Sequence, residues 1–156
     1  MPETVSIIGE SGDISVSDDI KAPISDKSGD GPILVVDDDP FAGGTTIRLL
    51  RHKLGREKSV EACTSARDAI NRILSGLNPS VILSDINMPI MSGIDFYDWL
   101  SVNRPELTQR IVFLSGGTDN EDIQKFVDSM TRRGQYLDKP YDTADLIAII
   151  QRILSK

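Results

Sequence analysis

Apolar runs of strand length alternate with amphipathic stretches of helix length from Pro32 to the C-terminus. The apolar runs predict five strands, at 33–36, 58–63, 80–84, 110–115 and 135–138. The amphipathic stretches predict five helices, at 41–54, 65–74, 93–102, 120–132 and 143–154. Ser65 with Asp68, and Ser92 with Asp95, have the spacing of a helix N-cap and its N3 partner, which supports two of the helix starts.

Five successive strand–helix units predict an α/β fold of the (βα)5 type. This fold is a doubly wound, five-stranded parallel sheet with helices on both faces. The predicted strands are apolar at consecutive positions, as in "ILVV" at 33–36. An unbroken apolar strand is typical of a sheet that is covered on both sides, whereas a half-exposed strand alternates apolar and polar residues.

Residues 1–31 differ in composition from the rest of the chain. They contain seven acidic and two basic residues and no aromatic residue, so they carry five of the seven net negative charges. Such a segment buries little apolar area, and we expect an acidic flexible tail or linker with at most short strands at "VSII" and "DISVS". The chain would then divide into this tail and one domain over 32–156.

The composition of the chain argues against several classes of protein. A net charge of −7 argues against a nucleic-acid-binding surface, which needs a basic patch. The single cysteine, Cys63, excludes an internal disulfide, and no apolar run approaches the roughly 18 residues of a membrane span. The first residues also lack the pattern of a signal peptide. We therefore expect a soluble cytoplasmic protein without membrane or nucleic-acid contact.

Polar side chains with reactive groups follow four of the five predicted strands. In chain order they are Asp37, Asp38 and Asp39, then Asp85 with Asn87, then Ser115, and finally Lys139. Ligands of parallel sheets bind beyond the carboxyl ends of the strands, so we expect these groups to converge on one edge of the sheet.

The expected excess of negative charge at this edge points to a divalent cation. Lys139 supplies one positive charge against several carboxylates, and Mg²⁺ prefers such oxygen ligands, while no Cys/His cluster favours zinc. A carboxylate beside Mg²⁺, a lysine and a hydroxyl is suited to accept a phosphoryl group. The chain contains no G-x-x-x-x-G-K-[ST] loop, which argues against a nucleotide donor bound here.

Four motifs together resemble the receiver domain of bacterial two-component response regulators, from about Gly31 to the C-terminus. They are "VVDDDP", "LSDINMPIMSG", "FLSGG" and "YLDKP", in the order of that family. The resemblance implies a flavodoxin-like receiver fold and a role in phosphorelay signalling. "LSGGT" with "LDKPYD" also resembles the C-terminal receivers of hybrid sensor histidine kinases. The sequence leaves open whether this chain is a stand-alone receiver or a fragment of a hybrid kinase.

The resemblance also implies a role for each residue at this edge. Asp85 would be the phosphoacceptor and also a ligand of Mg²⁺, Asp38 a direct ligand of Mg²⁺, Asp37 a ligand through water, and Asn87 a ligand through its backbone carbonyl. Lys139 would pair with a phosphoryl oxygen, Ser115 and Tyr136 would be switch residues, and the Lys139–Pro140 peptide bond would be cis. The donor would be a phosphohistidine on a sensor kinase or phosphotransfer domain. The chain would catalyse its own aspartyl phosphorylation and dephosphorylation without being a conventional turnover enzyme; it would have kinase activity only as part of a hybrid kinase.

Two pairs of glycines depart from the expected pattern. Gly43 and Gly44 lie inside the first predicted helix, where each costs up to ~1 kcal/mol relative to alanine and would loosen its start. Gly116 and Gly117 follow Ser115 and would leave a phosphoryl group open to water, which predicts a short-lived phosphorylated form.

Two other functions compete with the receiver. A small Mg²⁺-dependent phosphatase of the haloacid dehalogenase type would use Asp37 and Asp39, but it leaves Asp85 unexplained and the chain has no room for a cap domain. A receiver-like binding module that no longer transfers phosphate is the second alternative. Asp39 has a simpler interpretation as a charge at the helix N-cap before Pro40.

Overall fold

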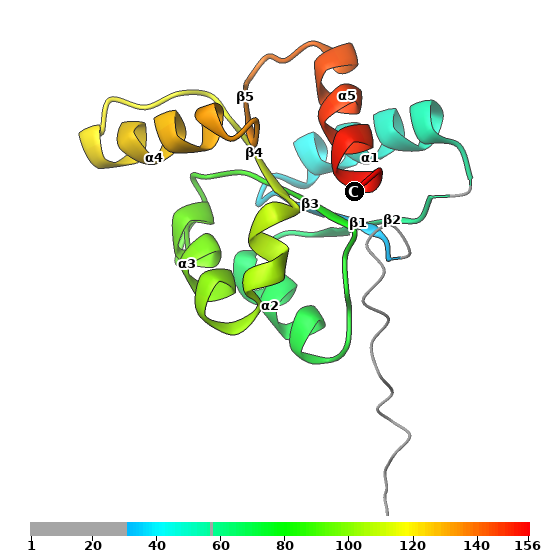
Figure 1. Cartoon of the computed structure of the whole chain (residues 1–156), viewed down its shortest axis with the longest axis horizontal. Coiled ribbons are helices and arrows are strands. Elements are labelled where there is room, and N and C mark those ends of the chain that lie inside the picture. Colours follow the sequence, from blue (N-terminus) through cyan, green and yellow to red (C-terminus); the bar gives the residue numbers. More distant parts are fainter. Residues whose placement is uncertain (1–30, 57) are drawn as a thin grey trace, which may run out of the picture.

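Five parallel strands form one central sheet in the computed structural model, which describes residues 31–56 and 58–156 (Figure 1). The strands are β1 (Ile33–Val36), β2 (Val60–Cys63), β3 (Val81–Ser84), β4 (Ile111–Ser115) and β5 (Tyr136–Asp138). They lie in the order β2-β1-β3-β4-β5, and each neighbouring pair is parallel. The predicted fold class is confirmed.

A helix follows each strand, at the positions that the amphipathic pattern predicts to within one residue. These helices are α1 (Pro40–Leu54), α2 (Ala66–Leu74), α3 (Gly93–Asn103), α4 (Glu121–Arg132) and α5 (Thr143–Leu154). The sequence pattern missed the short 3-10 helix η2 (Pro105–Gln109), which lies between α3 and β4. A single turn is too short to show a periodicity, and Leu107 alone marks it as a buried element.

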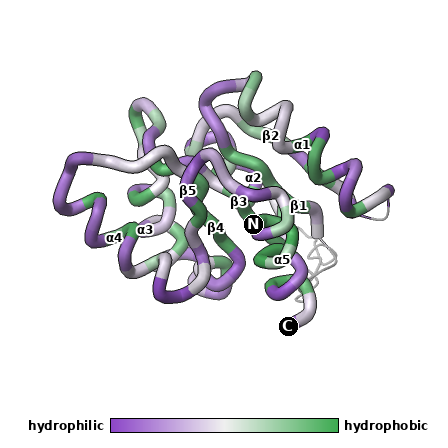
Figure 2. Tube along the Cα trace, turned by 90° about the horizontal axis from the view of Figure 1, so that it is seen from above, coloured by the Kyte–Doolittle hydropathy of each residue, from purple (hydrophilic) through white to green (hydrophobic). Residues whose placement is uncertain are grey.

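The sheet separates two hydrophobic cores. Ile33 and Val35 of β1 pack in the core formed with α1 and α5, whereas Leu34 and Val36 pack in the core formed with α2, α3 and α4. Figure 1 shows α1 and α5 on one face of the sheet and α2 and α3 on the other. Apolar residues accordingly gather on the strands, and hydrophilic residues lie on the outward turns of the helices (Figure 2). Both faces of β1 are covered, which explains its unbroken apolar sequence.

Side-chain caps fix where the helices begin. Ser92 accepts a hydrogen bond from the Asp95 N–H, and the Asp95 carboxylate accepts one from the Ser92 N–H, which forms a complete capping box on α3. Ser65 accepts from the Asp68 N–H on α2. Both predicted caps are therefore confirmed. The helix α1 runs from Pro40 through both internal glycines without interruption.

The strand order places the expected site residues at adjacent strand ends. Strand β1 lies beside β3, and the helices that follow them, α1 and α3, cover opposite faces of the sheet. Ligands of parallel sheets bind beyond such strand ends. The Asp85 N–H donates to the Val36 carbonyl, and the Asp37 N–H donates to the Cys63 carbonyl, so the ladder continues one residue past the strands. Asp37 and Asp85 are thereby held at this edge of the sheet.

The predicted tail at 1–31, with its candidate strands "VSII" and "DISVS", lies outside the described residues except for Gly31. The division into a tail and a domain over 32–156 stays a prediction. In the part of the chain that the structure describes, no helix combines the length and hydrophobicity needed to cross a membrane.

Candidate functional site

Three carboxylates converge at the ends of β1 and β3. Asp37, Asp38 and Asp85 each place one carboxylate oxygen within 4.8 Å of those of the other two. Asp37 is buried, Asp85 is partly buried and Asp38 is exposed. The sequence-based expectation that these strand ends meet is confirmed.

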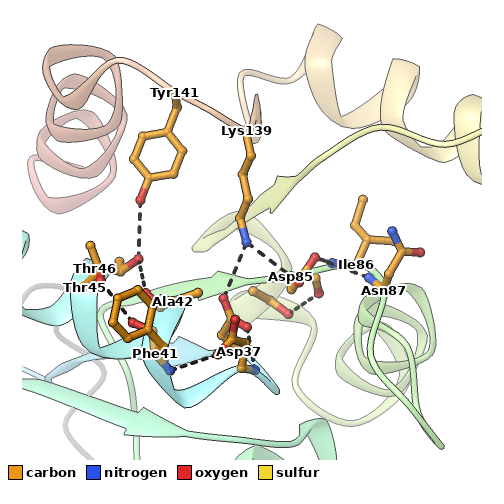
Figure 3. A network of polar contacts seen from close by, with 12 residues as sticks. Asp37, Phe41, Ala42, Thr45, Thr46, Asp85, Ile86, Asn87, Lys139 and Tyr141 are labelled. Carbon is orange, nitrogen blue, oxygen red and sulfur yellow. Dashed lines mark hydrogen bonds and ion pairs between the residues drawn. The ribbon is translucent and has the colours of Figure 1, made fainter.

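Lys139 reaches the same cluster from the end of β5. Its Nζ atom lies 3.5 Å from Asp37 Oδ2 and 3.8 Å from Asp85 Oδ2 (Figure 3). Its backbone N–H donates to the Ser115 carbonyl at 2.7 Å, which ties the lysine to the end of β4. The Lys139–Pro140 peptide bond is cis, as the resemblance implies. Within residues 31–56 and 58–156, Lys139 makes the only ion pairs of Asp37 and Asp85.

The backbone of the loop after β3 orients the Asp85 carboxylate. Oδ1 accepts a hydrogen bond from the Ile86 N–H at 2.7 Å and a longer one from the Asn87 N–H at 3.4 Å. Burial raises the pKa of Asp85 above its ordinary value, and repulsion from Asp37 adds to this effect. Lys139 and the two N–H groups act in the opposite direction but do not outweigh burial.

The donor set at this edge fits a small hard cation. The three carboxylate oxygens lie within 4.8 Å of one another, which would let one Mg²⁺ bind some of them directly and another through a water molecule. A bound cation would also offset the repulsion between Asp37 and Asp85. The site can therefore hold a divalent metal, and its charge favours one.

Asp39 stands apart from the three clustered carboxylates. Its side chain accepts from the Phe41 N–H at 3.0 Å and caps α1, while its own N–H donates to Asp37 Oδ1 at 2.9 Å. The interpretation of Asp39 as an N-cap is confirmed. Asn87 is exposed two residues after Asp85, and the role of its carbonyl stays a prediction.

Ser115 and Tyr136 are buried beside this cluster. Ser115 is 2% exposed at the end of β4, and Tyr136 is 8% exposed on β5. The Tyr136 hydroxyl donates to Asp138 Oδ1 at 2.8 Å and, at 3.4 Å, reaches the Ser115 carbonyl. Burial and the negative charge of Asp138 raise the pKa of Tyr136 to about 12.

Sequence reasoning assigned no role to Asp138, which holds the Tyr136 hydroxyl. The signal was present, because Tyr136 and Asp138 are two residues apart on one strand and side chains at that spacing share a face. It also missed the close contact at Gly93. A Cβ atom there would collide with the Asp85 carbonyl and the Ile86 Cα atom, so only glycine lets α3 start against the strand end.

A hydroxyl pair and two glycines complete the surroundings of the cluster. Thr46 Oγ1 lies 3.3 Å from the Tyr141 hydroxyl, which links α1 to the segment after β5 (Figure 3). Gly116 and Gly117 are exposed, and a Cβ atom at either position would have no atom within 4 Å. The segment after Ser115 thus leaves this side of the site open. Cys63 is buried, and burial raises the pKa of its thiol to about 12, which is the behaviour of a packing residue.

Comparison with known proteins agrees with this geometry. Residues 33–151 match the response regulator receiver domain family. The chain belongs to this family.

A response regulatory protein of uncharacterised function from Vibrio cholerae is 33% identical over 121 residues, which are 78% of this chain and 47% of the relative. The transcriptional regulatory protein BtsR of Escherichia coli is 31% identical over 121 residues, with the same coverage. The DNA-binding transcriptional regulator NtrC of Proteus hauseri is 32% identical over 130 residues, 80% of this chain and 25% of the relative.

Solved structures of receivers share the fold. The signal receiver domain of a signal transduction histidine kinase from Syntrophus aciditrophicus is 28% identical, with a TM-score of 0.64 over 80% of this chain and 90% of that one. A receiver domain protein from Clostridium thermocellum, at 23% identity, has a TM-score of 0.65 over 80% of this chain and 94% of that one, which supports the fold alone. The receiver spans a quarter to about half of the curated relatives named above. None of these comparisons supports the phosphatase alternative.

Proposed function

We propose that this receiver accepts a phosphoryl group on Asp85 from a phosphohistidine of a sensor kinase or phosphotransfer protein, in a reaction that depends on Mg²⁺. The observation that carries the proposal is the convergence of Asp37, Asp38, Asp85 and Lys139 from the ends of three strands. A purely structural ion-pair cluster would not need three carboxylates against one lysine, because the excess negative charge costs stability.

Each side chain at the site has a role in the proposed reaction. One oxygen of the Asp85 carboxylate attacks the phosphorus atom, the bond from phosphorus to the histidine nitrogen breaks, and that nitrogen keeps the bonding electron pair. The product is an acyl phosphate on Asp85. The Lys139 ammonium, 3.8 Å from the carboxylate, stabilises the charge on the transferred oxygens. Mg²⁺, which would be held by Asp38 and Asp85, by Asp37 through water and by the Asn87 carbonyl, would neutralise the same oxygens.

The consequences of phosphorylation pass through the two buried switch residues. We infer that the Ser115 hydroxyl bonds the phosphoryl group, and that Tyr136 changes its position in response, since its phenol reaches the Ser115 carbonyl. Strand β5 carries Tyr136 between α4 and α5, so the surface of these helices is where the change would be read. Exposed glycines after Ser115 support a short lifetime for the acyl phosphate. A cytoplasmic location, and output without nucleic-acid contact by this chain, belong to the same proposal.

Intact-mass spectrometry of the whole chain after incubation with acetyl phosphate tests the proposal. We expect one phosphoryl adduct on wild type with Mg²⁺, and none without Mg²⁺ or in Asp85→Asn. Asp98→Asn, which removes an exposed aspartate on α3, is the matched control and should keep the adduct. Failure of wild type to form an adduct, together with weak Mg²⁺ binding, would instead favour the phosphate-independent binding module.

A further inference from the structure

The loop between β3 and α3 contains a residue in an unfavourable conformation. Ile90 has a φ of 72°, and it is the one non-glycine residue with a positive φ in the described part of the chain. The Met91 N–H donates to the Pro89 carbonyl at 2.8 Å, which closes a three-residue γ-turn around Ile90. The γ-turn with a positive central φ is rare and strained, and a β-branched side chain is the least suited to it.

The same residue is also unusually exposed. Ile90 is 94% exposed, so its side chain packs against almost nothing in the folded chain. The backbone strain at Ile90 therefore costs free energy that no side-chain contact offsets. Asparagine or glycine would adopt the turn more easily and would be better solvated. Neither local folding nor packing explains why the position is occupied by an isoleucine.

The loop is anchored directly at the proposed phosphoacceptor. The Ile86 N–H donates to Asp85 Oδ1, and the Gly93 N–H donates to the Ile86 carbonyl at 2.7 Å. Gly93 lies three residues after Ile90, which is at most about 11 Å of extended chain. Because Gly93 packs against the Asp85 carbonyl, Ile90 lies close to the proposed phosphoacceptor.

This distance identifies what would cover Ile90. A protein interface of ordinary size covers about 800 Å² on each partner, a patch with a radius of roughly 16 Å. Any protein that brings a phosphohistidine to Asp85 centres its footprint there, and the footprint then includes Ile90. A small donor such as acetyl phosphate reaches Asp85 without covering the loop.

We propose that Ile90 is an apolar contact residue for the protein that delivers the phosphoryl group to Asp85. This inference rests on the proposed function and adds a residue that determines how well that protein binds. Phe41, 78% exposed at the start of α1, lies on the opposite side of the acidic cluster at the same edge of the sheet. The other two exposed large apolar residues among the described ones, Leu74 and Val102, lie in the last turns of α2 and α3 at the opposite edge.

The experiment compares two phosphoryl donors on matched variants of the whole chain. The variants are Ile90→Asn and, as control, Val102→Asn, which changes another highly exposed β-branched residue at the far edge. The small donor is acetyl phosphate with Mg²⁺. The protein donor is the autophosphorylated histidine kinase or phosphotransfer protein of the source organism that transfers fastest to wild type. Urea unfolding of each variant establishes that it is folded.

We expect Ile90→Asn to lower kcat/KM for the protein donor about tenfold or more, which is the effect of losing one buried aliphatic contact. Its rate with acetyl phosphate should equal that of wild type, and Val102→Asn should match wild type with both donors. Equal rates for Ile90→Asn and wild type with the protein donor would overturn the inference and leave the proposed function intact. An equal loss with both donors would also overturn it, because Ile90 would then act by shaping the loop. If wild type is not phosphorylated by acetyl phosphate, the proposed function itself fails and the inference fails with it.

Discussion

The position of Tyr136 depends on a single neighbouring carboxylate. Its hydroxyl donates to Asp138 at 2.8 Å inside the fold, and the pKa of Tyr136 is raised to about 12 by burial and by that negative charge. Asp138→Asn removes the charge but not the burial, so the pKa of Tyr136 should fall from about 12 while staying above its ordinary value of 10.0. Phenolate absorbance against pH, with Tyr136→Phe subtracted to remove the other tyrosines, measures the change. Asp98→Asn should leave the titration as in wild type, and an unchanged titration in Asp138→Asn would show that the hydrogen bond does not hold the phenol.

The raised pKa of Asp85 has a consequence for stability. Its folded-state pKa lies above the ordinary value of 3.8, so the folded chain binds this proton more tightly than the unfolded chain. The contribution of Asp85 to stability is therefore greatest at low pH and is lost as pH rises through the folded-state pKa. Without Mg²⁺, Asp85→Asn should raise the free energy of unfolding at neutral pH, because it removes a partly buried charge that faces Asp37.

This difference should shrink as the pH falls and should vanish well below pH 3.8, the ordinary pKa of the carboxyl, where Asp85 is protonated in both states. Urea unfolding of wild type and Asp85→Asn across this range makes the comparison, with Asp98→Asn as an exposed control. A variant less stable than wild type at neutral pH would mean that the pair with Lys139 outweighs burial, contrary to our account.

The sequence was sufficient to predict the residues of the site that follow strands. Asp37, Asp85 and Lys139 could be brought together from the sequence because carboxyl ends of parallel strands meet at one edge. Asp138 was within reach of the same kind of reasoning, because its spacing to Tyr136 puts both side chains on one face of β5. Gly93 and the strained Ile90 could not be assigned in this way, because their roles depend on distances of a few ångströms within the loop after β3, which no spacing rule fixes.

Helix α1 contains a glycine, Gly44, whose substitution should stabilise the fold. A Cβ atom at Gly44 would meet only the Arg48 Nη1 atom at 3.5 Å, the far end of a flexible side chain. Gly44→Ala should therefore raise the free energy of unfolding by about 0.5–1 kcal/mol, since alanine loses less backbone entropy in a helix. Urea unfolding measures this gain.

Gly93 is the informative contrast to Gly44. Gly93→Ala places a Cβ atom against the Asp85 carbonyl and should destabilise the fold by about 1–3 kcal/mol, although alanine is the better helix former. If Gly44→Ala also destabilised the chain, α1 would pack more tightly near Gly44 than the structure shows.

The elements themselves were well predicted where a pattern existed. The predicted helix boundaries agree with the observed ones to within one residue. One reason is that each amphipathic stretch begins just after an N-cap residue, such as Ser92 before α3. The strand predicted at 58–63 begins at Val60 instead, because its only neighbour, β1, begins at Ile33, and Ile33 pairs with Val60. The helix η2 was missed because Pro105 to Gln109 form one turn with one buried residue.

For the whole molecule, the acidic cluster predicts that Mg²⁺ stabilises the folded chain. A ligand that binds only the folded state adds about 2.7 kcal/mol at a concentration of 100 Kd. We expect Mg²⁺ to raise the Tm of wild type and to have little effect on Asp38→Ala, measured by thermal unfolding. Asp39→Ala is the matched control: it should lower the starting Tm by loss of a helix cap worth about 1 kcal/mol, yet keep the response to Mg²⁺. Equal responses in both variants would place the metal elsewhere.

Chemical trapping of the acyl phosphate identifies the residue that carries the phosphoryl group, which we propose to be Asp85. Borohydride reduces an aspartyl phosphate to homoserine, so peptide sequencing by mass spectrometry after treatment with acetyl phosphate and Mg²⁺ reports the modified position. We expect homoserine at position 85 and nowhere else in the chain. Homoserine at position 37 would contradict it and would favour the phosphatase alternative, in which the first aspartate after β1 is the nucleophile.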